Sequence, residues 1–219
     1  MTKPGFRKGR SGRAHGGGAG DAHDAFVSGA LFSQAQIMQL MKNEFARARR
    51  HGFPLGCLLL QVDRLANLVD LYGAGLRQAV RTAIAGLVRE RTRDPDLLGV
   101  SSDDRYLVIL PHTDIEQARV VADRLRSAFA GLSIEVDGRE LDLSISLGIS
   151  ASADGETMFF DTLVAQAEAA LDYATQQGGN VVVSFGEARL RGGEADPPGI
   201  VDPGVAEGGF GEGGEDRRG

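Results

Sequence analysis

Hydrophobic and polar positions follow two alternating periods through the middle of the chain, over residues 32–185. Over residues 32–51, apolar side chains recur every three or four positions, which is the period of an amphipathic helix. Residues 55–62 are instead almost continuously apolar, as is typical of a strand buried on both faces of a sheet. The same periods predict further helices at 65–72, 75–91, 115–129 and 161–177, and further strands at 97–100, 106–110, 133–136, 141–149 and 181–185.

Local signals mark where several of these elements begin and turn. Thr113-Asp114-Ile115-Glu116 has the pattern of a capping box, with Thr113 as the N-cap and Glu116 reaching back to it. Asp161 is expected to cap the last long helix, and Asp137-Gly138 predicts a tight hairpin turn. Because no internal repeat is present, the pattern predicts one α/β (α+β) domain with a central mixed or antiparallel sheet flanked by helices.

The two ends of the chain contain too few large apolar residues to form a core. Residues 1–24 are rich in glycine and basic side chains, and residues 188–219 in glycine, proline and acidic side chains. Neither segment can bury enough apolar surface to offset the entropy of ordering, so both are predicted to be disordered tails. Solvated linkers are the simplest interpretation, and docking segments are the alternative. The folded domain is therefore expected to span residues 25–187.

Composition and charge exclude several classes of function. The net charge of −6 and the pI of about 5.3 argue against general nucleic-acid binding, which requires a basic face. The single cysteine, Cys57, lies within an apolar run and is expected to pack in the core, as suits a reducing cytoplasm. No apolar run approaches the roughly 18 residues of a membrane span, and no hydrophobic segment follows the basic N-terminus. We therefore expect a cytoplasmic protein without a membrane partner.

Short strings recur in a fixed order along the predicted domain: Ala46-Arg47-Ala48-Arg49-Arg50, Leu71-Tyr72-Gly73, Leu107-Val108-Ile109-Leu110-Pro111, Leu143-Ser144-Ile145-Ser146-Leu147-Gly148, Ala167-Glu168-Ala169-Ala170-Leu171, and finally Gly178 and Asn180. Together they resemble the GGDEF family of diguanylate cyclases, whose members join two GTP molecules into cyclic di-GMP. The resemblance covers nearly the whole predicted domain. It implies a nucleotide-cyclase-like fold.

The signature turn of that family, Gly-Gly-Asp-Glu-Phe, falls on Ser102-Asp103-Asp104-Arg105-Tyr106. By this resemblance, Asp104 matches an acid that binds metal, whereas Arg105 replaces the glutamate that follows it. Ser102 and Asp103 replace glycines that let the backbone approach the nucleotide. Asp103 also places negative charge where a phosphate is expected.

Other positions that the family uses for GTP differ as well. The metal-binding aspartate at the end of the first strand falls on Gln61, and a neutral amide is a poor ligand for Mg²⁺. Asp63 matches a second family aspartate. The base-reading positions fall on Val69 and Gln78, and the phosphate-contacting positions fall on Ala66, Thr175 and Gly179. We therefore predict no metal, no cofactor and no catalytic residue at Gln61, Asp104 or Arg105, so that the chain is not an enzyme; a divergent active site is the alternative.

A second motif precedes the signature turn. In the family, an Arg-x-x-Asp pair ahead of the turn forms a product-inhibition site for cyclic di-GMP, and its register falls on Arg93 and Asp96. Arg124 matches a family position where a basic residue completes this site. An arginine can bridge N7 and O6 of guanine, and one carboxylate can accept from its N1–H and N2 amine.

Two alternatives to this site remain open at the level of sequence. Arg91 and Asp94 have the same spacing two residues earlier, and the arginines are also ordinary cations for the end of a helix. On the family register, we predict a receptor that binds cyclic di-GMP through Arg93, Asp96 and Arg124 and signals to an unidentified protein partner, with a ligand-linked homodimer as one form. A nucleotide-free interaction scaffold is the second hypothesis, and a residual cyclase is the third.

Overall fold

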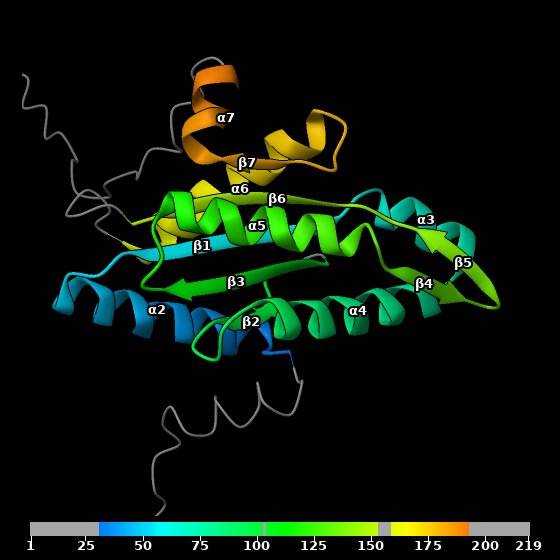
Figure 1. Cartoon of the computed structure of the whole chain (residues 1–219), viewed down its shortest axis with the longest axis horizontal. Helices are drawn as coiled ribbons and strands as arrows, with labels where there is room; N and C mark the ends of the chain where they lie inside the picture. Colours follow the sequence, from blue (N-terminus) through cyan, green and yellow to red (C-terminus); the bar gives the residue numbers. More distant parts are fainter. Residues whose placement is uncertain (1–30, 103, 153–158, 193–219) are drawn as a thin grey trace, which may run out of the picture.

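The computed structural model describes residues 31–102, 104–152 and 159–192. Its strands are β1 Leu55–Val62, β2 Leu97–Val100, β3 Arg105–Pro111, β4 Ser133–Val136, β5 Arg139–Asp142, β6 Ile145–Ala151 and β7 Val182–Ser184. Five of them form one sheet in the order β2-β3-β1-β6-β7, and β4 and β5 form a separate hairpin (Figure 1). β1 is antiparallel to both of its neighbours, whereas β7 joins β6 in parallel. The predicted mixed sheet is thus confirmed.

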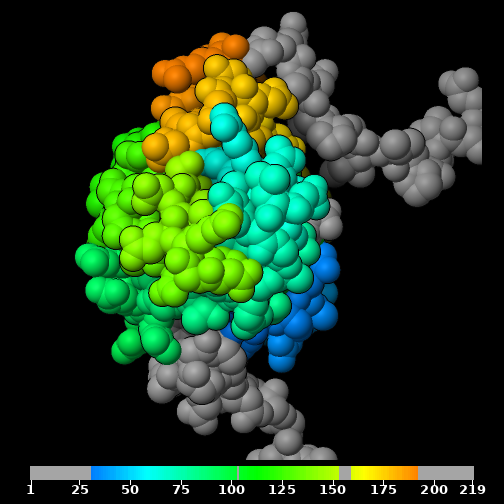
Figure 2. Space-filling model, turned by 90° about the vertical axis from the view of Figure 1, so that its right-hand side faces the viewer, coloured from blue at the N-terminus to red at the C-terminus, as the bar shows by residue number. Residues whose placement is uncertain are grey.

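Helices cover both faces of this sheet. They are α2 Gln34–His51, α3 Leu65–Tyr72, α4 Gly75–Arg91, α5 Ile115–Phe129, α6 Phe160–Gln176 and α7 Phe185–Gly192. In Figure 1, α5 passes over one face of β6 and α6 over the opposite face. α4 packs beside α5, and α2 packs on β2 and β3. At one end of the molecule, the β4–β5 hairpin and the α3–α4 segment lie side by side on the surface (Figure 2).

The central strand β1 is buried on both faces, which explains its unbroken apolar run. Cys57 is fully buried there, and burial raises the pKa of its thiol to about 12. A thiol with so high a pKa carries almost no thiolate at neutral pH, so it behaves as a small core residue. The prediction that Cys57 packs in the core is confirmed.

Gly148 lets α6 approach the sheet closely. A Cβ atom at this position would lie 2.1 Å from the carbonyl oxygen of Ala167 and 2.3 Å from the backbone nitrogen of Leu171. Both atoms belong to the helix backbone, so neither can move aside as a flexible side chain would. The glycine is therefore a packing requirement, and it fixes the depth at which α6 sits on β6.

The structure corrects two predicted helix starts. Asp114, and not Thr113, caps α5: its carboxylate accepts from the N–H of Gln117, whose side chain accepts from the N–H of Asp114. Thr113 is buried, and its hydroxyl donates to the carbonyl of Pro111, so this side chain does not cap the N-terminus of α5. Similarly, Asp161 lies within α6, which has Phe159 at its N-cap.

Two further differences concern strands. The segment predicted as one strand over 141–149 is divided into β5 and β6 near Ser144, whose carbonyl accepts from the N–H of Asp63. The last strand ends at Ser184 because its hydroxyl accepts from the N–H of Glu187 and opens α7, which the sequence did not predict. α7 spans the expected domain boundary between residues 187 and 188. The tail 1–24 and residues 193–219 lie outside the described residues.

Candidate functional site

Polar side chains gather where β1 ends and β3 begins, around the signature turn. We call Gln61, Asp63, Asp104, Arg105 and Asp172 the signature edge. Gln61 lies directly opposite Arg105 in the β1–β3 ladder, so the two side chains share one face of the sheet. Asp172 reaches the same face from α6. The residue Asp103 lies outside the described residues.

Arg105 bridges two elements of the signature edge. Its Nε donates to Oε1 of Gln61 over 3.1 Å, and its Nη2 donates to Oδ1 of Asp172 over 2.6 Å. The Arg105 side chain is only 25% exposed, so this guanidinium is partly shielded from water. The cation therefore links β1, β3 and α6 at one point.

Asp104 has an ion pair of its own, with Arg77 of α4. Nε of Arg77 lies 2.7 Å from Oδ2 of Asp104. Asp104 also adopts a left-handed backbone with φ of 64°, which aspartate tolerates better than most residues. The pair borders a pocket of about 200 Å³ that is lined by Ala74, Arg77, Gln78, Arg81, Val100, Asp104 and Tyr106.

Asp63 accepts three hydrogen bonds from two other segments of the chain. Its Oδ2 accepts from the hydroxyl of Ser144 over 2.6 Å and from the backbone N–H of Asn180 over 2.8 Å, and its Oδ1 accepts from the hydroxyl of Ser146 over 2.6 Å. The two serines, which the sequence presented as pleat positions, are thus the partners of this carboxylate. Asp63 holds the end of β1 to β6 and to the loop before β7.

The family's divalent metal does not fit this donor set. Gln61 and Asp172 are engaged by Arg105, Asp104 by Arg77, and Asp63 by three hydrogen-bond donors. Within the described ranges, no group of three or more His, Cys, Asp or Glu side chains is arranged to hold a metal ion. We therefore derive no chemical step through a metal at the signature edge.

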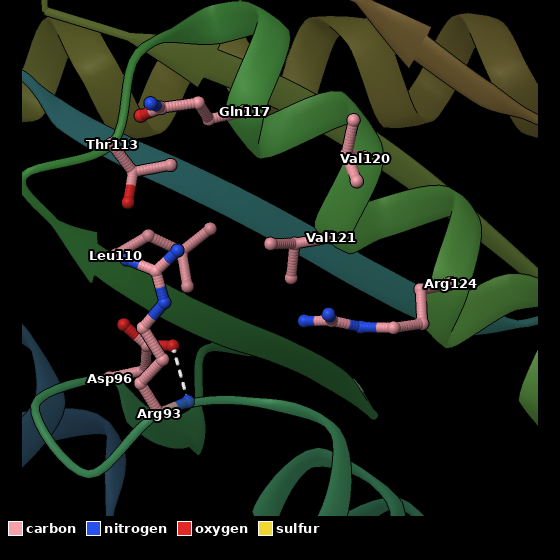
Figure 3. A pocket seen from close by; sticks show the side chains of 8 residues that line it. All are labelled: Arg93, Asp96, Leu110, Thr113, Gln117, Val120, Val121 and Arg124. Atoms are coloured by element: carbon pink, nitrogen blue, oxygen red, sulfur yellow. Dashed lines mark hydrogen bonds between the residues drawn. The ribbon is translucent and has the colours of Figure 1, made fainter.

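A second site lies on another part of the surface, between the turn that follows α4 and the helix α5 (Figure 3). It is a pocket of about 170 Å³ lined by Arg93, Asp96, Leu110, Thr113, Gln117, Val120, Val121 and Arg124, which we call the Arg93 pocket. Arg124 points into it from α5, and Arg93 rises from the opposite wall. The structure thus brings together the three residues that the motif singled out.

Asp96 is the buried charge of the Arg93 pocket. Only 4% of it is exposed, and its Oδ2 accepts from the backbone N–H of Arg93 over 2.8 Å. Burial raises the pKa of its carboxyl above the ordinary value, although this hydrogen bond and the charges of Arg93 and Arg124 oppose the shift. A hydrogen-bonding ligand for the carboxylate would lower the cost of keeping it charged there.

The structure distinguishes the two registers that the sequence left open. Asp94 is exposed and does not line the pocket, and Arg91 pairs with its neighbour Glu90 at 3.3 Å. Among the described residues, no hydrogen bond or salt bridge engages the guanidinium of Arg93 or of Arg124. Both cations are therefore available to a ligand, and they also border an adjoining hollow of about 350 Å³.

Three pocket residues of α5 escaped the sequence analysis. Gln117, Val120 and Val121 lie three to seven positions before Arg124, which is the spacing of one helix face. Val120 is 66% exposed, so its apolar side chain is accessible to a ligand at the edge of the pocket. The helical period ending at Arg124 is the signal that could have revealed them.

Comparison with known proteins identifies what this arrangement is similar to. A family model described as "Diguanylate cyclase, GGDEF domain" matches residues 27–181. The diguanylate cyclase DgcP of Pseudomonas aeruginosa is 30% identical over 132 residues, which are 59% of this chain and 20% of DgcP. Diguanylate cyclase SiaD of Pseudomonas aeruginosa, solved with its activator SiaC, superposes with a TM-score of 0.65 at 27% identity, covering 70% of this chain and 58% of SiaD. The GGDEF domain of DgcB from Caulobacter crescentus, solved with c-di-GMP, superposes with a TM-score of 0.65 at 16% identity over 71% of this chain and 92% of that domain.

These comparisons overturn the prediction that the chain is not an enzyme. Several of the curated relatives that match it are named as diguanylate cyclases and another as a response regulator, and the chain spans about a fifth to a third of the length of these relatives. The prediction rested on the combined replacements at the metal-ligand, base-reading and phosphate-contacting positions, which are Gln61, Val69, Gln78, Thr175 and Gly179, whereas similarity to these enzymes extends over most of the fold. One further observation is structural: among the described helices, none combines the length and apolarity needed to cross a membrane.

Proposed function

The chain belongs to the GGDEF domain family of diguanylate cyclases, and from this premise we propose that it binds cyclic di-GMP in the Arg93 pocket. The observation that carries the proposal is the nearly buried Asp96 carboxylate between two guanidiniums that no described side chain engages. The solved DgcB domain, which contains c-di-GMP, supports the choice of ligand.

The chemistry of the Arg93 pocket suits one guanine base. The Asp96 carboxylate can accept from N1–H and the N2 amine, and an arginine can donate to N7 and O6 on the other edge. The apolar side chains of Leu110 and Val121 offer a surface for the face of the purine. A volume of about 170 Å³ is below that of typical whole-ligand sites, so the pocket takes one base while the rest of the dinucleotide lies outside.

The phosphates of the ligand are expected to lie in the hollow beside the pocket. Arg91, Arg93 and Arg124 line that hollow together with Glu90, which pairs with Arg91. Arg93 and Arg124 are therefore the guanidiniums that remain for phosphate oxygens, with which they pair well. A protein partner would then recognise the ligand-bound chain through the exposed surface of α5. In one arrangement, the ligand bridges two copies of the chain. We also propose a cytoplasmic location, which a single cysteine that forms no internal disulfide supports.

Calorimetric titration with cyclic di-GMP tests the proposal. We expect binding by the wild-type chain, weakened about tenfold to a hundredfold in Arg93→Ala and in Asp96→Asn, as for loss of a bidentate contact to a base. Asp94→Asn represents the other register and is the matched control; it should bind as the wild type does, because Asp94 is exposed and lines neither the pocket nor the hollow. Absence of heat and of any thermal shift at saturating ligand would refute the proposal and favour an interaction scaffold.

Formation of cyclic di-GMP from GTP is a second candidate function, favoured because several curated relatives are named as diguanylate cyclases. Incubation with GTP and Mg²⁺, followed by mass spectrometry of the nucleotides, tests it directly. Product formed by the wild type and lost in Asp104→Asn would support this candidate. Wild-type samples that leave GTP unconverted, alongside a working cyclase as positive control, would exclude it.

A further inference from the structure

We propose that the guanidinium of Arg105 is the resident cation of the signature edge, in the place where the family holds a divalent metal. Its position is set by partners on two elements. Nε is held by Gln61 of β1, and Nη2 by Asp172 of α6, 67 residues away in the chain. A guanidinium held by two directional hydrogen bonds is oriented as well as positioned.

The two replacements at this edge are complementary. Gln61 offers a neutral oxygen to the guanidinium, while Asp172 supplies the one negative charge that balances it. With aspartate at 61 and glutamate at 105, these three positions would instead carry only negative charge, which a divalent cation would be needed to offset. Gln61 and Arg105 are lateral partners in the β1–β3 ladder, so the exchange is local to one rung of the sheet.

The neighbouring carboxylates are already engaged by groups of the protein. Asp63 accepts from Ser144, Ser146 and Asn180, and Asp104 is paired with Arg77. Recruiting either of them would break contacts that fix the loop before β7 or the start of β3. Arg105 and Arg77 thus pair with Asp172 and Asp104, while Asp63 is held by neutral donors, and the structure of the signature edge is expected to be independent of divalent metal.

Mn²⁺ is a suitable probe because free Mn²⁺ gives an electron paramagnetic resonance signal that decreases on binding. The wild-type chain should leave this signal unchanged, and its unfolding midpoint should be the same in Mn²⁺ and in EDTA. The double variant Gln61→Asp/Arg105→Glu restores two carboxylates; it should bind Mn²⁺ at least about tenfold more tightly than the wild type and gain thermal stability from it.

Three outcomes are informative. Uptake of one Mn²⁺ per wild-type chain that disappears in Asp104→Asn would overturn the proposal, as would a folded double variant that takes up no Mn²⁺. If circular dichroism shows that the double variant does not fold, the wild-type titration decides alone. None of these variants touches the Arg93 pocket, so titration with cyclic di-GMP remains an independent test of the proposed function.

Discussion

Gly179 lies so close to Asp63 that a Cβ atom at this glycine would be 2.6 Å from Oδ1 of the carboxylate. Gly179 also has a φ of 84°, a conformation that residues with side chains rarely adopt. The family position where a phosphate-contacting cation was expected is therefore a point of close backbone approach in this chain. The loop before β7 is held against the end of β1 through this contact and through the N–H of Asn180.

Removing the Asp63 carboxylate should destabilise the fold. Asp63→Ala leaves the hydroxyls of Ser144 and Ser146 and the N–H of Asn180 without their acceptor, and we expect a loss of about 2–4 kcal/mol. Urea unfolding monitored by circular dichroism measures it. Asp70→Ala, at an exposed position of α3, is the control and should change stability by less than about 0.5 kcal/mol. Equal effects of the two substitutions would contradict the role assigned to Asp63.

Gly148 and Gly86 should respond in opposite directions to the same substitution. Gly148→Ala forces a Cβ atom against the α6 backbone, which should cost about 3 kcal/mol or prevent folding. A Cβ atom at Gly86, within α4, meets nothing within 4 Å, so Gly86→Ala should stabilise the chain by about 0.5–1 kcal/mol through helix propensity. Thermal unfolding of both variants gives the comparison. A neutral Gly148→Ala variant would show that α6 is not tightly fixed on β6.

The pH dependence of ligand binding should follow Asp96. Its raised pKa means that the carboxylate is protonated at a higher pH than an ordinary aspartate, and a protonated group no longer accepts two guanine donors. Affinity for cyclic di-GMP should therefore fall as pH decreases through this raised pKa, and titrations from neutral to mildly acidic pH measure it. An identical pH profile for Asp96→Asn would sink this assignment.

The raised pKa of Asp96 affects the stability of the fold in the opposite direction to ligand binding, because stability decreases as pH rises. Because the pKa of Asp96 is raised in the folded chain, its contribution is fully present below the ordinary value of 3.8 and is lost as pH rises through the raised pKa. Asp96→Asn should accordingly gain stability relative to the wild type between acidic and neutral pH. Parallel urea titrations across this range, with Asp94→Asn as the control, test the sign.

Glu187 should hold α7 against the rest of the domain. Its carboxylate accepts from the N–H and hydroxyl of Ser184 and forms an ion pair with Arg119 of α5. Burial alone would raise the pKa of Glu187, but these hydrogen bonds and the Arg119 charge outweigh it and lower that pKa. The contribution to stability is thus present above the ordinary glutamate range and is lost as pH falls through the lowered value.

Glu187→Gln should release α7 while leaving the sheet intact. We expect faster hydrogen exchange in residues 185–192, with a loss of global stability of about 1 kcal/mol or less, as for a partly exposed pair. Exchange measured by mass spectrometry separates this local effect from global unfolding. Unchanged exchange in that segment would mean that the helix is held by its apolar contacts instead.

Elements with strong local signals were predictable, and those fixed by distant partners were not. The apolar run of β1 and the local sequence of α3 and α4 predicted the observed bounds of these elements, since their signals lie within or next to each element. Adjacent candidates such as Thr113 and Asp114 could not be ranked as N-caps, because the choice depends on which side chain is buried beneath Pro111. The spacing of the family motif from the signature turn identified Arg93, Asp96 and Arg124 as residues of one pocket. The hydrogen bond between Arg105 and Asp172 could not be predicted, because no sequence period connects these two residues.

Both margins of the main sheet are too short to recruit another strand. β7 has three residues, and β2 has four, whose outer side is already occupied by the hydrogen bonds of Phe32 to Leu98 and Val100. Short or covered margins discourage the edge-to-edge addition that leads to aggregation. Assembly of this domain with a second copy or another protein is therefore expected to use surfaces other than the margins of the main sheet, and at β2 the main-chain groups are already paired with Phe32.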